Sequence, residues 1–98
     1  MIQYNISIFV ENKIEDQAIK ALTKHIVPEL NAWDFIEQAH VFEICSHQEP
    51  DSKGFSVQCL IPQTEERRKE AIENLISNFF LAEFPNQFVY FPSQLKRL

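Results

Sequence analysis

The sequence of 98 residues contains a single glycine, and this scarcity excludes several classes of function. Phosphate-binding loops and dinucleotide-binding fingerprints need glycines at fixed spacing, because the backbone must come close to a phosphate. Two cysteines, Cys45 and Cys59, are too few for a disulfide framework or an iron–sulfur cluster, and no CxxC pair occurs. We therefore expect free thiols in a reducing compartment, with no resident cofactor and no metal site.

An excess of positive charge and a long apolar run are also missing. The chain has 14 acidic residues against nine lysines and arginines, which gives a formal net charge of −5. A nucleic-acid-binding protein is expected to carry a basic surface instead. No segment reaches the roughly 18 consecutive apolar residues that can span a bilayer, and the N-terminal residues do not resemble a secretion signal. We expect a cytoplasmic protein that binds neither nucleic acid nor a membrane.

The remaining composition is that of one small globular domain. Apolar residues make up 45% of the chain and include nine phenylalanines, which is enough for a compact core at this length. No linker, repeat or low-complexity segment interrupts the pattern. Residues 1–98 are therefore expected to form a single domain.

The spacing of apolar residues predicts six secondary-structure elements. The opening stretch MIQYNISIFV alternates at period two, which is typical of a strand with one apolar face. Asn12 followed by Glu15 resembles a capping box at a helix start, and Pro28 is expected to kink or restart that helix. Thr64 is expected to cap the second helix. The expected elements are a strand over 2–10, a helix over 12–30, strands over 36–46 and 55–62, a helix over 64–84 and a strand over 86–91 closed by Pro92.

This order of elements, β-α-β-β-α-β, is the split βαβ pattern of ferredoxin-like folds. Right-handed crossovers place the first and third strands in the centre of a four-stranded antiparallel sheet, with both helices on one face. The expected fold class is therefore α+β, a ferredoxin-like two-layer sandwich. In the hairpin we expect Ile44 opposite Val57 and Phe42 opposite Cys59, because this register joins apolar residues on the helix-covered face.

The other face of the sheet is expected to be uncovered and partly apolar. The large side chains expected there include Phe9, Val41 and Leu60, and such an apolar patch usually marks an interaction surface. A homodimer in which two sheets face each other would cover it economically. The full set expected on this face is Asn5, Ser7, Phe9, Val41, Glu43, Cys45, Ser56, Gln58 and Leu60, with either Val89 and Phe91 or Phe88 and Tyr90.

Four residues of this face are candidate ligand-binding residues: Asn5, Ser7, Glu43 and Gln58. Asn5 and Gln58 are expected on adjacent central strands, where paired amides can hold a ligand carbonyl or amine. The alternative is that these amides satisfy each other across a dimer interface. Glu43 would be a base if apolar neighbours raised its pKa, or else an edge charge that prevents aggregation.

The helix pair His25 and Glu29 is a second candidate, because a histidine beside a carboxylate can act as a base or as half of a metal site. The i,i+4 spacing is equally typical of a structural pair on a helix. No catalytic constellation is complete anywhere in the chain. We therefore favour a protein that is not an enzyme.

Four segments, MIQYNISI, HIVPEL, GFSVQ and FPNQFVYFPSQL, resemble a family of small bacterial proteins known as domain of unknown function 4286. The resemblance covers nearly the whole chain. Val27 is an extra residue within the family's HIPE pattern, and Pro92 stands where the family tends to have arginine. The resemblance implies a dimeric α+β-barrel-like fold and implies no activity.

Three hypotheses about function remain. The first is a homodimer that binds a small molecule or a protein partner at the open sheet face. The second is a protein-assembly subunit without a ligand. The third is a dimeric α+β-barrel enzyme such as a cofactor-independent oxygenase; haem-degrading relatives of that kind are similar in an asparagine at Asn5 but use a histidine that residues 64–84 lack.

Overall fold

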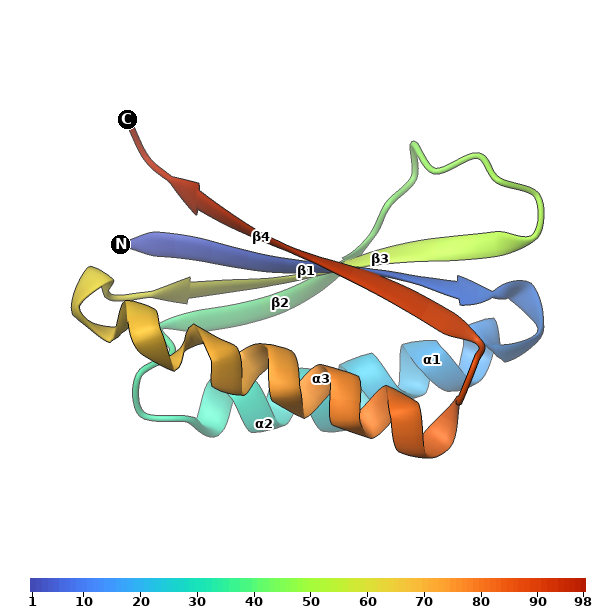
Figure 1. Ribbon diagram of the computed structural model, residues 1–98, viewed down its shortest axis with the longest axis horizontal. Coiled ribbons are helices and arrows are strands. Elements are labelled where there is room, and N and C mark those ends of the chain that lie inside the picture. The colour runs from blue at the N-terminus through green and yellow to red at the C-terminus, as the bar shows by residue number, and fades with distance from the viewer.

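The computed structural model describes residues 1–98 and has two layers, a four-stranded antiparallel sheet and a layer of helices on one of its faces (Figure 1). The strand order β2-β3-β1-β4 places β1 and β3 in the centre and confirms the predicted ferredoxin-like α+β fold. The strands are β1 (Ile2–Glu11), β2 (Gln38–Glu43), β3 (Ser52–Ile61) and β4 (Phe88–Lys96). The helical segments are η1 (Asn12–Ile14), α1 (Glu15–Ala21), η2 (Leu22–Ile26), α2 (Val27–Ala32), η3 (Gln63–Arg68) and α3 (Lys69–Glu83).

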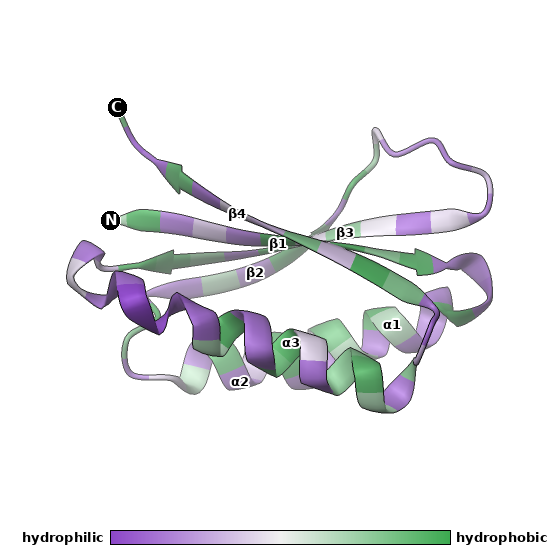
Figure 2. Ribbon diagram, viewed as in Figure 1, coloured by the Kyte–Doolittle hydropathy of each residue, from purple (hydrophilic) through white to green (hydrophobic).

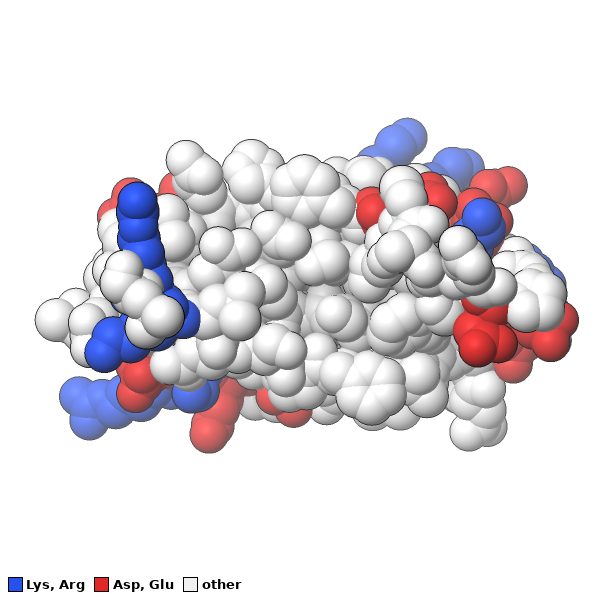
Figure 3. Space-filling view, turned by 90° about the horizontal axis from the view of Figure 1, so that it is seen from above, with Lys and Arg blue, Asp and Glu red and all other residues white.

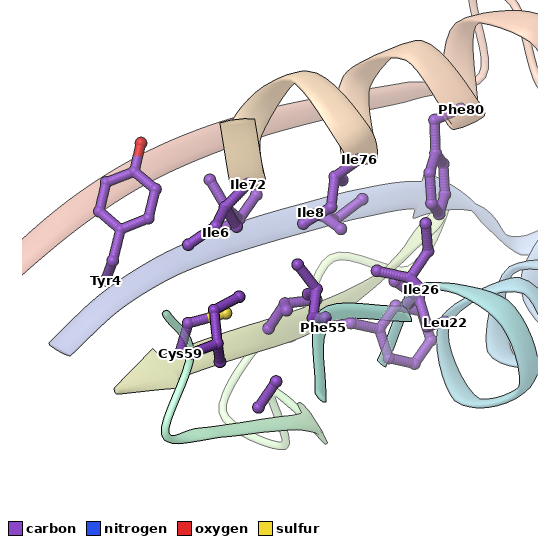
Figure 4. Packing of buried hydrophobic residues seen from close by; sticks show 14 of the residues in the cluster. Tyr4, Ile6, Ile8, Leu22, Ile26, Phe55, Cys59, Ile72, Ile76 and Phe80 are labelled. Atoms are coloured by element: carbon purple, nitrogen blue, oxygen red, sulfur yellow. The ribbon is translucent and has the colours of Figure 1, made fainter. Parts of the chain in front are cut away.

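The core lies between the sheet and the helices and follows the alternation in β1 and β3. Ile6 and Ile8 are fully buried and point toward α3, whose Ile72 and Ile76 meet them (Figure 4). Hydrophobic and hydrophilic residues alternate along the helices (Figure 2), and in α3 the hydrophobic residues Ile72, Ile76 and Phe80 are the buried ones. The 20 residues of this cluster remove one face of the sheet from water and leave the other face uncovered.

The carboxylate of Glu73 connects α3 to strands β1 and β4 through two hydrogen bonds. The Tyr4 hydroxyl donates to Glu73 Oε1 at 3.2 Å, and the Tyr90 hydroxyl donates to Glu73 Oε2 at 2.9 Å. Burial, together with the nearby Glu73 charge, raises the pKa of Tyr4 to about 12. The helix is thus held over β1 and β4 by hydrogen bonds as well as by apolar packing.

Both helix starts differ from the predicted caps. The helical region after β1 begins with the 3-10 turn η1, and the Asn12 side chain does not cap it. Asn12 Nδ2 instead donates to the carbonyl of Pro50 at 2.6 Å, which anchors the loop between β2 and β3. Thr64 lies within the 3-10 segment η3 and likewise caps no helix.

The helix around Pro28 continues through a π-helical turn. Residues Leu22–Ile26 form this turn, in which the backbone N–H of Val27 donates to the carbonyl of Leu22 five residues earlier. A π turn holds one more residue than an α turn. The extra residue therefore fits inside the helix while Leu22, Ile26 and Leu30 all remain buried.

The predicted register of the hairpin is wrong. In the structure Val41 pairs with Val57 and Glu43 pairs with Phe55, which is a shift of three residues. Because side chains alternate at period two, an odd shift moves every residue of β2 to the opposite face. Val41 consequently packs against the core and Glu43 lies on the helix side at the sheet edge, so neither belongs to the open face.

Strand β4 is longer than predicted, because Pro92 does not end it. β4 continues to Lys96 and pairs with β1 along its whole length. A proline without an N–H is tolerated on an edge strand, where one side of the strand needs no partner. The sequence left open which residues of this strand lie on the uncovered face. The register shows that Val89 and Phe91 do, because both face away from the helices.

Candidate functional site: the open face of the sheet

The uncovered side of the sheet, called the open face below, carries no charged side chain in its centre. Figure 3 shows this side with lysine, arginine, aspartate and glutamate only around its margins. The open face consists of Gln3, Asn5, Ser7, Phe9, Gln38, His40, Phe42, Gly54, Ser56, Gln58, Leu60, Val89, Phe91, Ser93 and Leu95. A surface of this size without charge is unusual outside an interface.

A stripe of amides and hydroxyls runs along the two central strands. Gln3 Nε2 donates to Gln58 Oε1 at 2.9 Å, and Gln58 Nε2 donates to Ser56 Oγ at 3.3 Å. Asn5 lies directly between Gln58 and Ser93 in the two strand ladders, yet its Oδ1 is buried and has no hydrogen-bond partner. A buried acceptor without a donor costs roughly 1–3 kcal/mol, so this position has unused capacity for a donor.

Large apolar side chains flank this polar stripe on the edge strands. Phe42 of β2 is 52% exposed, and Val89, Phe91 and Leu95 of β4 are 51–57% exposed. The central Leu60 is partly buried beside them. Two apolar margins thus enclose a polar centre.

One end of the open face is closed by an aromatic packing arrangement around the only glycine. A Cβ atom on Gly54 would lie 2.7 Å from the Phe9 ring, so the ring rests directly on the glycine backbone. The rings of Phe9 and His47 are 4.8 Å apart, and His47 Nε2 lies 2.7 Å from Ser52 Oγ. These contacts hold the loop of residues 44–51 against the end of the sheet.

The structure brings together most of the predicted site residues. Asn5, Ser7 and Gln58 all lie on the open face, as do Phe9 and Leu60. The placement of Glu43 and Val41 on this face is wrong for the reason given above. Three residues of β2 on this face, Gln38, His40 and Phe42, were missed because the predicted register turned them toward the helices. Ser93 and Leu95 of β4 were missed because the strand was expected to end at Pro92. No feature of the hairpin sequence distinguishes the two registers strongly, since apolar residues occur on both faces of β2.

The remaining candidates lie apart from the open face. His25 is on the helix layer, where its ring stacks on Phe79 with centroids 6.0 Å apart. Cys45 is exposed in the loop after β2, whereas Cys59 is buried and both are free. Burial raises the pKa of the Cys59 thiol to about 12, which makes it a poor nucleophile. No three histidine, cysteine or carboxylate side chains are grouped so that they could hold a metal ion.

The helices of the structure are all too short or too polar to cross a lipid bilayer.

Comparison with solved structures shows the same fold in distant proteins. A conserved protein of unknown function from Bacteroides thetaiotaomicron, suggested to be an oxidoreductase, aligns with a TM-score of 0.63 at 12% identity over 98% of this chain and 96% of its own. Rv0793 from Mycobacterium tuberculosis aligns with a TM-score of 0.60 at 12% identity over 100% and 96%. A candidate antibiotic biosynthesis monooxygenase from Bacillus cereus gives 0.51 at 11% identity over 99% and 94%. At these identities the likeness shows the fold alone.

The sequence comparisons complete this picture. No curated protein matches the chain. The model of the domain of unknown function DUF4286, by contrast, matches residues 1–98, as the motifs in the sequence predicted. The chain belongs to the DUF4286 family.

Proposed function

We propose that this protein acts as a cytoplasmic homodimer whose two open faces meet and enclose a small, uncharged molecule. The main support for this proposal is the composition of the open face. Its margins are apolar, and its centre is polar, carries no charge and contains an unsatisfied acceptor at Asn5. Free thiols at both cysteines agree with a reducing compartment.

The apolar margins support the dimer. Four strands about 4.8 Å apart, with six to ten residues each at about 3.3 Å per residue, offer a footprint of roughly 550 Å² per copy. Two such faces would bury roughly 1,100 Å² in total, which is near the lower limit of specific protein interfaces. In a two-fold dimer the exposed Phe42, Val89 and Phe91 leave water together, and no charge is desolvated in the centre.

The polar stripe supports a ligand between the two sheets. Asn5 Oδ1 is already buried in the single chain, and the amide of Gln58 loses its remaining access to water when the faces meet, so both amides need partners. Gln58 already accepts from Gln3 and donates to Ser56, whereas Asn5 Oδ1 lacks a donor. A ligand that donates an N–H or O–H to Asn5 would satisfy it, and the absence of charge favours a neutral molecule.

Native mass spectrometry of protein purified without added ligand tests this proposal. We expect a dimer that carries a reproducible extra mass. A dimer without extra mass would contradict the ligand and favour the assembly subunit, while a monomer at all concentrations would contradict the dimer itself.

Substitution of Asn5 tests its role in binding. Asn5→Ala should weaken binding of the released molecule about fivefold, because one hydrogen bond contributes about 1 kcal/mol, and should leave the dimer intact. Asn78→Ala is the matched control, because Asn78 is exposed on α3. Equal affinities of the two variants for the molecule, measured by calorimetry, would show that Asn5 does not contact it.

An enzymatic role is the second candidate, and one observation favours it. His40 lies on the open face directly opposite Gln58, which places a titratable imidazole beside the polar stripe. It is the only imidazole on the face, and imidazole is the side chain most often used for proton transfer in catalysis. The test is turnover of the molecule released from the dimer. Loss of its turnover in His40→Gln with unchanged affinity would support catalysis, and full turnover in that variant would exclude a catalytic His40.

A further inference from the structure

The open face is not flat, because one end projects and the other is hollow. The loop between β2 and β3, residues 44–51, rises above the sheet on the side away from the helices (Figure 1). At the opposite end of the strands lies a hollow of about 570 Å³. It is lined by Met1, Gln3, Leu60, Leu95, Lys96 and Arg97.

The projecting loop is acidic and held in place. Its charged residues are Glu49 and Asp51, both exposed and without an ion pair in the chain. Asn12 fixes the loop through its side-chain bond to Pro50 and through its backbone N–H, which donates to the Asp51 carbonyl at 3.2 Å. A loop held in this way offers its carboxylates without a large ordering cost.

The hollow is basic and has a floor of two leucines and one glutamine. Lys96 and Arg97 line it and make no ion pair within the chain. Leu60, Gln3 and Leu95 lie side by side in the strand register and form the floor. The hollow therefore suits an acidic segment of chain that is not charged throughout.

Resting on the homodimer proposed above, we infer that Glu49 and Asp51 of each copy enter the basic hollow of the other copy. Two sheets can meet face to face about a two-fold axis that runs either along or across the strands. The axis along the strands places loop against loop, where both bulk and like charges oppose contact. The axis across the strands places each acidic loop over the opposite basic hollow, so the contact occurs twice in the dimer.

Charge reversal tests this orientation by sedimentation equilibrium at low salt. Lys96→Glu with Arg97→Glu should raise the dimer dissociation constant at least tenfold, and Glu49→Lys with Asp51→Lys should do the same. All four substitutions together should return the constant to within about threefold of the wild type, because the pairs are then merely exchanged. Lys20→Glu with Lys24→Glu, on the exposed helix side, is the matched control and should change nothing.

Cross-linking gives an independent reading of the same contact. Leu95→Cys places a thiol at the hollow, and native Cys45 is exposed in the loop. We expect oxidation to join Cys45 of one copy to position 95 of the other. A stable wild-type dimer with unchanged affinity after charge reversal, or with Cys45 joined to Cys45, would overturn this inference while keeping the dimer. A monomeric wild type would overturn the proposed function instead.

Discussion

At the scale of single residues, two buried acids keep their protons in the folded chain. Cys59 is fully buried in β3, and burial raises the pKa of its thiol from 9.0 to about 12. Tyr4 is buried beside Glu73, and its pKa rises from 10.0 to about 12. Between about pH 9 and pH 12 the folded chain therefore binds more protons than the unfolded chain. The free energy of unfolding must fall as the pH rises through this window.

Cys59→Ala is expected to remove the first part of this fall. The thiol begins to titrate in the unfolded chain at a lower pH than Tyr4, around pH 9, and one such group changes the unfolding free energy by up to about 1.4 kcal/mol per pH unit. The free energy of unfolding of the variant should be lower than that of the wild type at pH 7, because a buried group is lost. It should fall less steeply as the pH rises. Urea denaturation under reducing conditions from pH 7 to 11 measures this slope.

Cys45→Ala is the control for that experiment. Cys45 is exposed, so its removal should leave the wild-type slope unchanged. If Cys59→Ala kept the steepness of the wild type, burial of the thiol would not be the cause of alkaline destabilisation.

At the scale of elements, the π turn of η2 explains how the chain accepts the residue that splits the HIPE pattern. The Val27 N–H reaches Leu22 rather than Thr23, so the extra residue is absorbed within one turn. Leu22, Ile26 and Leu30 keep contact with the core on either side of it. A regular α-helix of the same length would rotate the later residues by about 100° and expose part of this face.

Deletion of Val27 should therefore be tolerated. The π turn is expected to become an α turn, with the free energy of unfolding within about 1 kcal/mol of the wild type. Deletion of exposed Asn74 from the regular helix α3 is the matched control, because it turns Ile76 and Phe80 away from Ile72. Thermal unfolding should show one cooperative transition for the first deletion and none for the second; equal losses would contradict the role of the π turn.

The strands show what could and could not be predicted from the sequence. The strict alternation in Ile2–Val10 and Phe55–Ile61 identifies both central strands and the polar residues Asn5 and Gln58 on their open side. β2 has no such asymmetry, because Val41 and Phe42 are both apolar neighbours on opposite faces. Its register depends on tertiary packing of Ala39 and Val41 under the helices, which no local pattern reveals.

The predicted helix start at Asn12 and the predicted strand end at Pro92 were wrong for a related reason. Asn12 and Glu15 have the spacing of a capping box, but the Asn12 side chain is used by the neighbouring loop at Pro50. Pro92 suggests a strand end, yet an edge strand loses nothing by a missing N–H. In both cases a distant segment, rather than the local sequence, determines how the residue is used.

At the scale of the whole molecule, the open face has no counterpart within the chain. All helices lie on the other side (Figure 1). The edge strands β2 and β4 both expose large apolar side chains. The charged residues lie around this surface rather than on it (Figure 3). The homodimer proposed above would bury these apolar margins against a second copy.

The most direct test is the mass in solution of three leucine and phenylalanine variants. Leu60→Glu and Phe91→Glu each place a carboxylate on the open face, where burial of an unpaired charge opposes association by several kcal/mol. Leu81→Glu is the control, because Leu81 is equally apolar but 58% exposed outside the sheet. Sedimentation equilibrium should show a dimer for the wild type and Leu81→Glu and a folded monomer for the two face variants. Dimers of unchanged affinity in Leu60→Glu and Phe91→Glu, or a monomeric wild type, would contradict a homodimer formed through the open face.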